Sequence, residues 1–286
     1  MKPNKKLLIS AGILVILGTA ISTACVKIHD AKAISSMQKS TREITEKITK
    51  IDIASDWNDV IIKRGNTDKI TVSYVEGEKN EIEFDTQNNT LTIRNLLKNK
   101  REKWYDYISF DFHTAQYYDI MITVPKDFSA ETVLNLRCGD IEISDLKGSL
   151  DINSSNGDVE IKRCEFSSIR CDLRYGDIEM SEVSSRNTDI ISAYGDIELD
   201  KVSGKITAEA RYGDIEADMI KADEIAFKSD CGDIDCLIDG KKEDYTINCT
   251  TRAGANNIDN IENNASGAKK LDVQANLGDV SVRFTK

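Results

Sequence analysis

The sequence predicts an all-β fold, a repeat β-solenoid with rungs of about 18–19 residues, preceded by one N-terminal transmembrane or signal helix. Three observations predict it. A Gly-Asp-Ile/Val tripeptide recurs at a spacing of 18 or 19 residues, apolar residues alternate with polar ones on both sides of it, and a long apolar run follows three lysines at the N-terminus.

The recurring tripeptide is the strongest of these signals. Six near-identical copies follow one another at Gly139-Asp140, Gly157-Asp158, Gly176-Asp177, Gly195-Asp196, Gly213-Asp214 and Gly232-Asp233. A seventh unit centres on Gly254, where Ala255 replaces the Asp, and an eighth returns at Gly278-Asp279. Self-similarity at a fixed period indicates a stacked repeat architecture.

The residues around each Gly predict short strands with one buried face. After Gly176, Ile178 and Met180 are apolar with Glu179 between them, and the other units repeat this alternation. At each Gly the inward positions are three residues apart instead of two, which predicts a corner. Each unit is therefore expected to contain two or three short strands. Eight rungs at ~4.8 Å would make a rod about 35–40 Å long. No unit has room for a helix with i, i+3, i+4 apolar spacing, which excludes a leucine-rich repeat.

The chain divides into four expected regions. Residues 1–30 are expected to form the membrane anchor or signal segment, and the polar residues 31–47 a stalk or linker, for which a helix is one form. Residues 48–130 show weaker alternation and are expected to form irregular β rungs that cap the solenoid. Residues 131–286 carry the regular repeat.

The N-terminal segment predicts a single membrane anchor through residues 7–26. Lys2, Lys5 and Lys6 precede an uncharged run of twenty residues, long enough to span a bilayer core of about 30 Å. The lysines should stay in the cytoplasm, which places the C-terminal domain outside it. Two alternatives remain: cleavage after an Ala31-Lys32-Ala33 site with secretion, and a lipoprotein modified at Cys25.

The order of the early strands, followed by serial GD[IV]E[IL] units behind one membrane segment, resembles a bacterial family of unknown function. Its members are described as "putative adhesins" and include Lia-operon-type envelope-stress proteins. The resemblance covers residues 44–286 and implies a β-solenoid and a cell-envelope location. It implies no catalytic or ligand-binding residue, and the chain departs from the pattern at Gly254-Ala255.

Charge is distributed unevenly along the chain. Residues 1–130 carry 19 Lys/Arg and 17 Asp/Glu, whereas residues 131–286 carry 19 and 32. The acidic half would repel phosphate backbones, so nucleic acid is not an expected partner.

The repeated aspartates are a candidate cation site: Asp140, Asp158, Asp177, Asp196, Asp214 and Asp233. Stacking would bring their charges close together, and Ca²⁺ ligation by several carboxylates would relieve the repulsion. The alternative is that each Asp accepts hydrogen bonds from backbone N–H groups at its own corner. The Gly-rich nonapeptide of calcium-binding β-rolls is absent, so we favour the structural role and expect no cofactor.

A candidate ligand-binding segment lies in residues 98–118, where basic residues precede a cluster of aromatic ones. The candidate residues are Arg101, Lys103, Trp104, Tyr105 and Tyr107. Aromatic and cationic side chains together suit a glycan, an anionic polymer or a membrane surface. The alternative is a hairpin that covers the open end of the solenoid.

The seven cysteines include no CxxC pair, and only Cys231 and Cys236, which flank one corner, are close enough in sequence to suggest a disulfide. Two histidines cannot supply a Ser-His-Asp or Cys-His set. The acids recur on every rung, whereas an active site is a local break in a repeat. The sequence thus predicts a non-catalytic envelope interaction module whose partner is an unknown envelope protein or polymer. The alternatives are a polysaccharide lyase or glycosidase on a β-helix, and an envelope-stress regulatory component.

Overall fold

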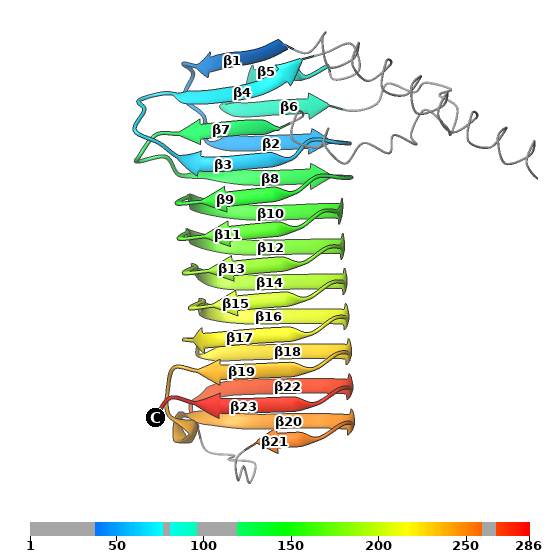
Figure 1. Cartoon of the computed structure of the whole chain (residues 1–286). Helices are drawn as coiled ribbons and strands as arrows, with labels where there is room; N and C mark the ends of the chain where they lie inside the picture. The colour runs from blue at the N-terminus through cyan, green and yellow to red at the C-terminus, as the bar shows by residue number, and fades with distance from the viewer. Residues whose placement is uncertain (1–37, 77–80, 96–118, 259–266) are drawn as a thin grey trace, which may run out of the picture.

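The computed structural model describes residues 38–76, 81–95, 119–258 and 267–286 as a two-sheet β-solenoid (Figure 1). Each regular rung contains one long strand and one short strand. The long strands stack in one sheet and the short strands in the other, with the apolar core between them. The predicted N-terminal membrane segment lies outside the described residues, and none of the described helical turns is long and apolar enough to span a bilayer.

The short-strand sheet has twelve strands. In spatial order they are β1 (Gln38–Ile44), β4 (Ile70–Glu76), β7 (Ile120–Val124), β3 (Val60–Arg64), β9 (Ile141–Ser144), β11 (Val159–Lys162), β13 (Ile178–Ser181), β15 (Ile197–Asp200), β17 (Ile215–Ile220), β19 (Ile234–Ile238), β23 (Val280–Phe284) and β21 (Asn256–Ile258).

The long-strand sheet has eleven strands. In spatial order they are β20 (Tyr245–Ala253), β22 (Lys269–Leu277), β18 (Glu224–Cys231), β16 (Ser203–Tyr212), β14 (Ser184–Tyr194), β12 (Glu165–Tyr175), β10 (Lys147–Asn156), β8 (Ala130–Leu136), β2 (Lys50–Ser55), β6 (Thr90–Asn95) and β5 (Glu83–Gln87). A short 3-10 helix, η3 (Lys242–Asp244), precedes β20.

Like residues stack on like residues throughout the regular rungs. Ile178 is in register with Val159 on one side and Ile197 on the other, and the Glu residues that follow them are paired in the same way. A third apolar position in each unit, ahead of the next long strand, is also buried: Leu146, Cys164, Val183, Val202 and Ile220. The predicted parallel stacking of alternating strands is confirmed, with two strands in each rung.

Glycine is required at the corner because successive corners nearly touch. Gly176 has φ +130°, and a Cβ built on it would lie 2.3 Å from the carbonyl oxygen of Gly157. The same contact recurs at each corner of the regular stack, so any side chain there would force adjacent rungs apart.

The stack does not follow chain order at its C-terminal end. The last two strands, β22 and β23, insert between the rung of β18 and β19 and the rung of β20 and β21 (Figure 1). Gly278 consequently stacks on Gly232, and Gly254 stacks on Gly278. The seventh unit of the sequence is thus the terminal rung of the described solenoid.

The N-terminal region contains a rung with the parallel pairing of the regular repeat, followed by antiparallel strands at the N-terminal end of the stack. The rung of β2 and β3 stacks directly on β8 and β9 in parallel, with Asn58-Asp59 in place of Gly-Asp. Asn58 is fully buried, and its Oδ1 accepts hydrogen bonds from Ser55 Oγ and Asn95 Nδ2. At the end of the stack the pairing is antiparallel: β4 pairs with β7 and with β1 in one sheet, and β5 pairs with β6 in the other.

The predicted stalk over residues 31–47 is wrong for its C-terminal part. Residues 38–44 form β1, which pairs with β4 along its whole length. As an edge strand it buries only Ile44, so its sequence lacks the apolar alternation that identifies the other strands.

We expect the solenoid to tolerate removal of one whole rung. Deleting residues 188–205 joins Asn187 to Ile206, the registered partner of Thr188, so the neighbouring ladders can meet again. Circular dichroism and a thermal melt should show a cooperative β protein. In contrast, Ile197→Asp places a charge at a fully buried position and should cost at least ~4 kcal/mol. A deletion that unfolds the chain, beside a stable Ile197→Asp variant, would contradict this architecture.

Candidate functional site: repeated surface columns

The described surface carries its functional groups in columns that run from rung to rung. Three columns stand out, and each derives from one position of the repeat. They are the corner aspartates, a row of acidic side chains on the outer face of the short-strand sheet, and exposed hydrophobic residues just before several of the corners.

The corner aspartates form one continuous hydrogen-bonded chain, named here the Asp ladder. In each step the backbone N–H of one corner Asp donates to Oδ1 of the Asp in the preceding rung. The donors Asp140, Asp158, Asp177, Asp196, Asp214, Asp233 and Asp279 lie 2.7–2.9 Å from Oδ1 of Asp59, Asp140, Asp158, Asp177, Asp196, Asp214 and Asp233. At the end of the ladder, Ala255 N donates to Asp279 Oδ1 at 2.6 Å.

The ladder explains two features of the sequence. Asp59 extends the ladder beyond the six predicted aspartates, and Ala255 ends it in the terminal rung, where no further described corner needs an acceptor. The expectation that each Asp accepts hydrogen bonds within its own corner is corrected, because parallel stacking places each carboxylate beside the N–H of the next rung.

Ligation of Ca²⁺ by the Asp ladder stays a prediction that we do not favour. Within the described ranges, no group of three or more His, Cys, Asp or Glu side chains has the arrangement of a metal site. Each ladder Oδ1 is already an acceptor, and its partner N–H offsets part of the carboxylate charge.

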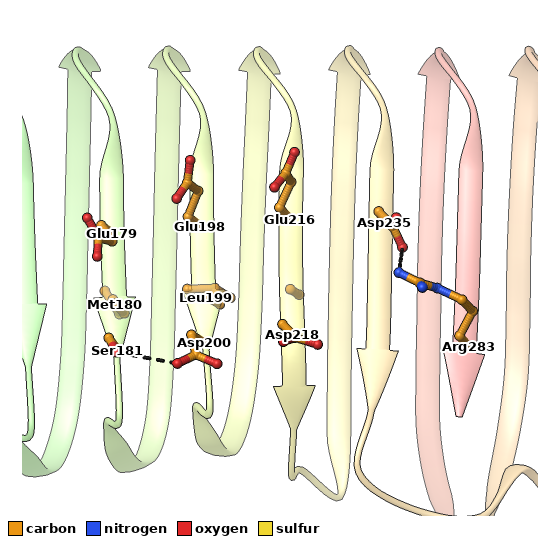
Figure 2. A pocket seen from close by; sticks show the side chains of 11 residues that line it. Glu179, Met180, Ser181, Glu198, Leu199, Asp200, Glu216, Asp218, Asp235 and Arg283 are labelled. Carbon is orange, nitrogen blue, oxygen red and sulfur yellow. Dashed lines mark hydrogen bonds and ion pairs between the residues drawn. The ribbon is translucent and has the colours of Figure 1, made fainter. Parts of the chain in front are cut away.

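The acidic row lies two residues beyond the ladder and consists of Glu142, Glu160, Glu179, Glu198, Glu216 and Asp235. Figure 2 shows Glu179, Glu198 and Glu216 projecting side by side from successive short strands. Together with Asp200 and Asp218 they line an open groove of about 350 Å³. At one end Asp235 pairs with Arg283, Oδ1 to Nη2 at 2.9 Å.

Charge repulsion in the acidic row acts on its central member. Partial burial, and then the neighbouring carboxylates of Glu216 and Glu179, raise the pKa of Glu198 above its ordinary value. The carboxylates stand on one face and do not oppose each other across a cleft. A glycosidase requires two carboxyl groups that flank the scissile bond, so this row does not have that arrangement.

The third column contains Tyr175, Tyr194 and Tyr212, which are in register on β12, β14 and β16. Their side chains are exposed and their rings stack on each other, with centroids 5.0 Å apart. The three rings therefore point outward from the corner.

The predicted aromatic and basic candidates, Arg101, Lys103, Trp104, Tyr105 and Tyr107, lie outside the described residues. The described chain leaves the long-strand sheet at Asn95 and enters the short-strand sheet at Ile120. The segment therefore connects the same two sheets that Gly-Asp connects in a regular rung.

Cys231 and Cys236 are both free thiols. Cys236 is fully buried and Cys231 lies at the corner surface, so the suggested disulfide between them is not formed. Burial raises the pKa of Cys164 to about 11 and that of Cys171 to about 12, so neither thiol is activated as a nucleophile.

Two variants of Asp196 should separate a hydrogen-bonding ladder from a metal ladder. Asp196→Asn keeps an acceptor for Asp214 N–H and should leave the melting temperature nearly unchanged, whereas Asp196→Ala should cost about 1 kcal/mol. EDTA should not shift the melt of the wild-type chain. A large drop in melting temperature with EDTA, reversed by Ca²⁺, would instead establish a cation site.

Glu198→Gln should stabilise the protein at neutral pH. The folded-state pKa of Glu198 is raised, so protonation of Glu198 stabilises the folded state. This stabilisation is lost as the pH rises through the folded-state pKa. At pH 7 the Gln variant should therefore melt higher than the wild type by a small amount, on the order of 1 °C. The difference should disappear near pH 4. Glu182→Gln, exposed at the opposite corner, is the control.

Comparisons with known proteins give one family match and several similarities to solved structures at low sequence identity. No curated protein sequence matches the chain. Among solved structures, an adhesin described as "putative" from Bacteroides fragilis NCTC 9343 is 16% identical, with a TM-score of 0.45 over 86% of this chain and 97% of that one. A "putative cell adhesion protein" from Clostridium sporogenes ATCC 15579 is 11% identical, with a TM-score of 0.30 over 87% and 100%.

A "putative lipid binding protein" from Parabacteroides distasonis ATCC 8503 is 14% identical, with a TM-score of 0.42 over 87% of this chain and 97% of that one. The family model of Toastrack DUF4097 matches residues 48–283, which include every regular rung. This match covers the serial Gly-Asp corners and the parallel strands of both sheets. The chain therefore belongs to the Toastrack DUF4097 family.

Proposed function

We propose that the protein is a membrane-anchored, extracytoplasmic interaction module that holds a rigid β-solenoid outside the cytoplasm and binds a cell-envelope partner without catalysis. The observation that carries this proposal is the repetition of the surface. The Asp ladder, the acidic row and the stacked tyrosines each extend over several rungs. Such a surface suits an extended partner, because the same side chains recur at the spacing of the rungs.

The anchoring part of the proposal rests on the N-terminal sequence. Lys2, Lys5 and Lys6 precede the apolar residues 7–26, a combination typical of a segment that inserts with its N-terminus in the cytoplasm. The acidic character of residues 131–286 keeps such a domain soluble and separate from anionic lipid surfaces.

The non-catalytic part rests on the arrangement of the acids. Glu179, Glu198 and Glu216 are equivalent members of one row and project from the same face of the sheet (Figure 2). General acid-base catalysis needs two groups with different environments around one substrate bond. An extended carboxylate row is better suited to contact with a basic or hydroxyl-rich polymer.

A topology experiment tests the proposal. Alkaline phosphatase and green fluorescent protein should each be fused after Lys286 in the full chain and expressed in a bacterium. We expect an active phosphatase, a dark fluorescent protein and retention of the fusion in the membrane fraction, because the lysines hold the N-terminus inside. Replacing Lys2, Lys5 and Lys6 with Glu is the matched control and should reduce phosphatase activity. A fluorescent fusion in the soluble cytoplasmic fraction would overturn the proposal.

A further inference from the structure

The exposed large hydrophobic side chains of the described chain all lie on one line. Five such side chains are 42–56% exposed, and each occupies the residue immediately before a corner: Trp57, Tyr175, Tyr194, Tyr212 and Leu277. Strand register places Tyr212 beside Cys231, and Cys231 beside Leu277. Trp57 precedes Asn58-Asp59, which takes the Gly-Asp place in its rung. We name this column the hydrophobic ridge; it also includes the partly exposed Cys138 and Cys231, and the polar Asn156 occupies its third rung.

The ridge is ordered along its length. The three tyrosine rings stack nearly parallel, with interplanar angles of 14° and 6°. Arg137 lies over the Trp57 ring at 5.6 Å, and Arg174 lies over the Tyr175 ring at 5.2 Å. Because the tyrosine faces cover each other, the ridge presents ring edges and hydroxyl groups. A sugar ring therefore finds no open face to stack on at Tyr194, whereas another protein surface can pack along the edges.

The two flanks of the ridge differ in charge over its middle rungs. On the long-strand side, the residue before the ridge is an exposed arginine in three alternate rungs, Arg137, Arg174 and Arg211, whereas Asp56 and Asp230 hold that position in the first and seventh rungs. None of the three forms an ion pair with a described acidic side chain, unlike the paired Lys147, Lys162 and Lys205. On the short-strand side runs the Asp ladder. Its hydrogen bonds use Oδ1, which leaves Oδ2 as an acceptor.

We propose that the ridge is the interface of a parallel homodimer, in which two solenoids pack ridge to ridge around a twofold axis parallel to their length. In a parallel pair, the arginine flank of each copy faces the Asp ladder of the other. An antiparallel pair would place arginine against arginine and aspartate against aspartate. Charge complementarity thus selects a second copy in one orientation, and the contact is isologous, as closed dimers require.

The composition and length of the ridge suit such an interface. Trp, Tyr and Arg are the residues that most often dominate protein–protein binding energy. From Trp57 to Leu277 the ridge covers eight rungs, or about 35–40 Å at ~4.8 Å per rung. At that length, the interface must include both flanks and be about 20 Å wide to reach the roughly 800 Å² per partner of a standard interface.

This inference goes beyond the proposed function and does not require it. Parallel packing does place the N-terminal ends of both copies at the same end of the dimer, as two chains anchored in one membrane need. The oligomeric state is measured on purified protein, so a failed topology experiment and a failed dimer experiment remain distinguishable.

Two native cysteines report the orientation. Cys138 and Cys231 occupy the second and seventh rungs of the ridge, counted from Trp57, and both are free and partly exposed. The full chain, purified in mild detergent, should be treated with a short bis-maleimide and the joined peptides identified by mass spectrometry. A parallel dimer should give Cys231–Cys231 and Cys138–Cys138 links. A link between Cys138 and Cys231, or no linked dimer, would overturn the proposal.

Charge and side-chain variants test the interface itself. Sedimentation of the full chain in detergent should show a dimer whose Kd rises about tenfold or more in the double variant Tyr194→Ser/Arg211→Glu. The matched control is Arg186→Glu, an equal change of charge at an exposed position near the opposite corner, which should leave the Kd unchanged. Melting curves establish that both variants are folded. A monomer at micromolar concentration, or a dimer that the ridge variants do not weaken, contradicts the assignment.

Discussion

The corner contact between successive rungs is the constraint on which the rest of the structure depends. A glycine carbonyl lies almost against the next glycine, and one residue later a backbone N–H donates to the carboxylate of the preceding rung. The close approach fixes the distance between rungs, and the hydrogen bond satisfies an N–H that no strand partner reaches. Register follows from both, since a slip of one residue would replace glycine by a side chain and remove the acceptor.

Because every rung repeats this contact, every exposed position is repeated as well. Side chains at equivalent positions necessarily form columns at the rung spacing. Partial burial and the repulsion between like charges in a column raise the pKa of Glu198. Like aromatic rings in a column stack, which orders Tyr175, Tyr194 and Tyr212. The surface properties of the protein are therefore consequences of its core geometry, and a functional surface on this fold is naturally linear.

Much of the regular solenoid could be predicted from residue patterns, because period-two alternation and a recurring Gly-Asp report local geometry directly. The outward direction of the tyrosines could not be predicted from the sequence. Tyr175 is two residues after the buried Leu173, so the alternation would place it inward, but it is exposed because the two sheets end at this corner. The edge strand β1 buries too little to leave a pattern. The order of the last two rungs involves contacts between distant residues. Ala255 nevertheless carries a signal, because a terminal rung can omit the carboxylate without depriving a further corner N–H of its acceptor.

The insertion of β22 and β23 has a consequence for how the chain is made. A solenoid stacked in chain order can add rungs as they emerge from the ribosome or the membrane, and each new rung finds its template already formed. Here the template for β20 and β21 is the final segment of the chain. The rung of β20 and β21 can therefore complete its stacking only after β22 and β23 have been synthesised and have paired with it. The C-terminal strand is held between neighbours on both sides, so the rod cannot fray one rung at a time from its last residue.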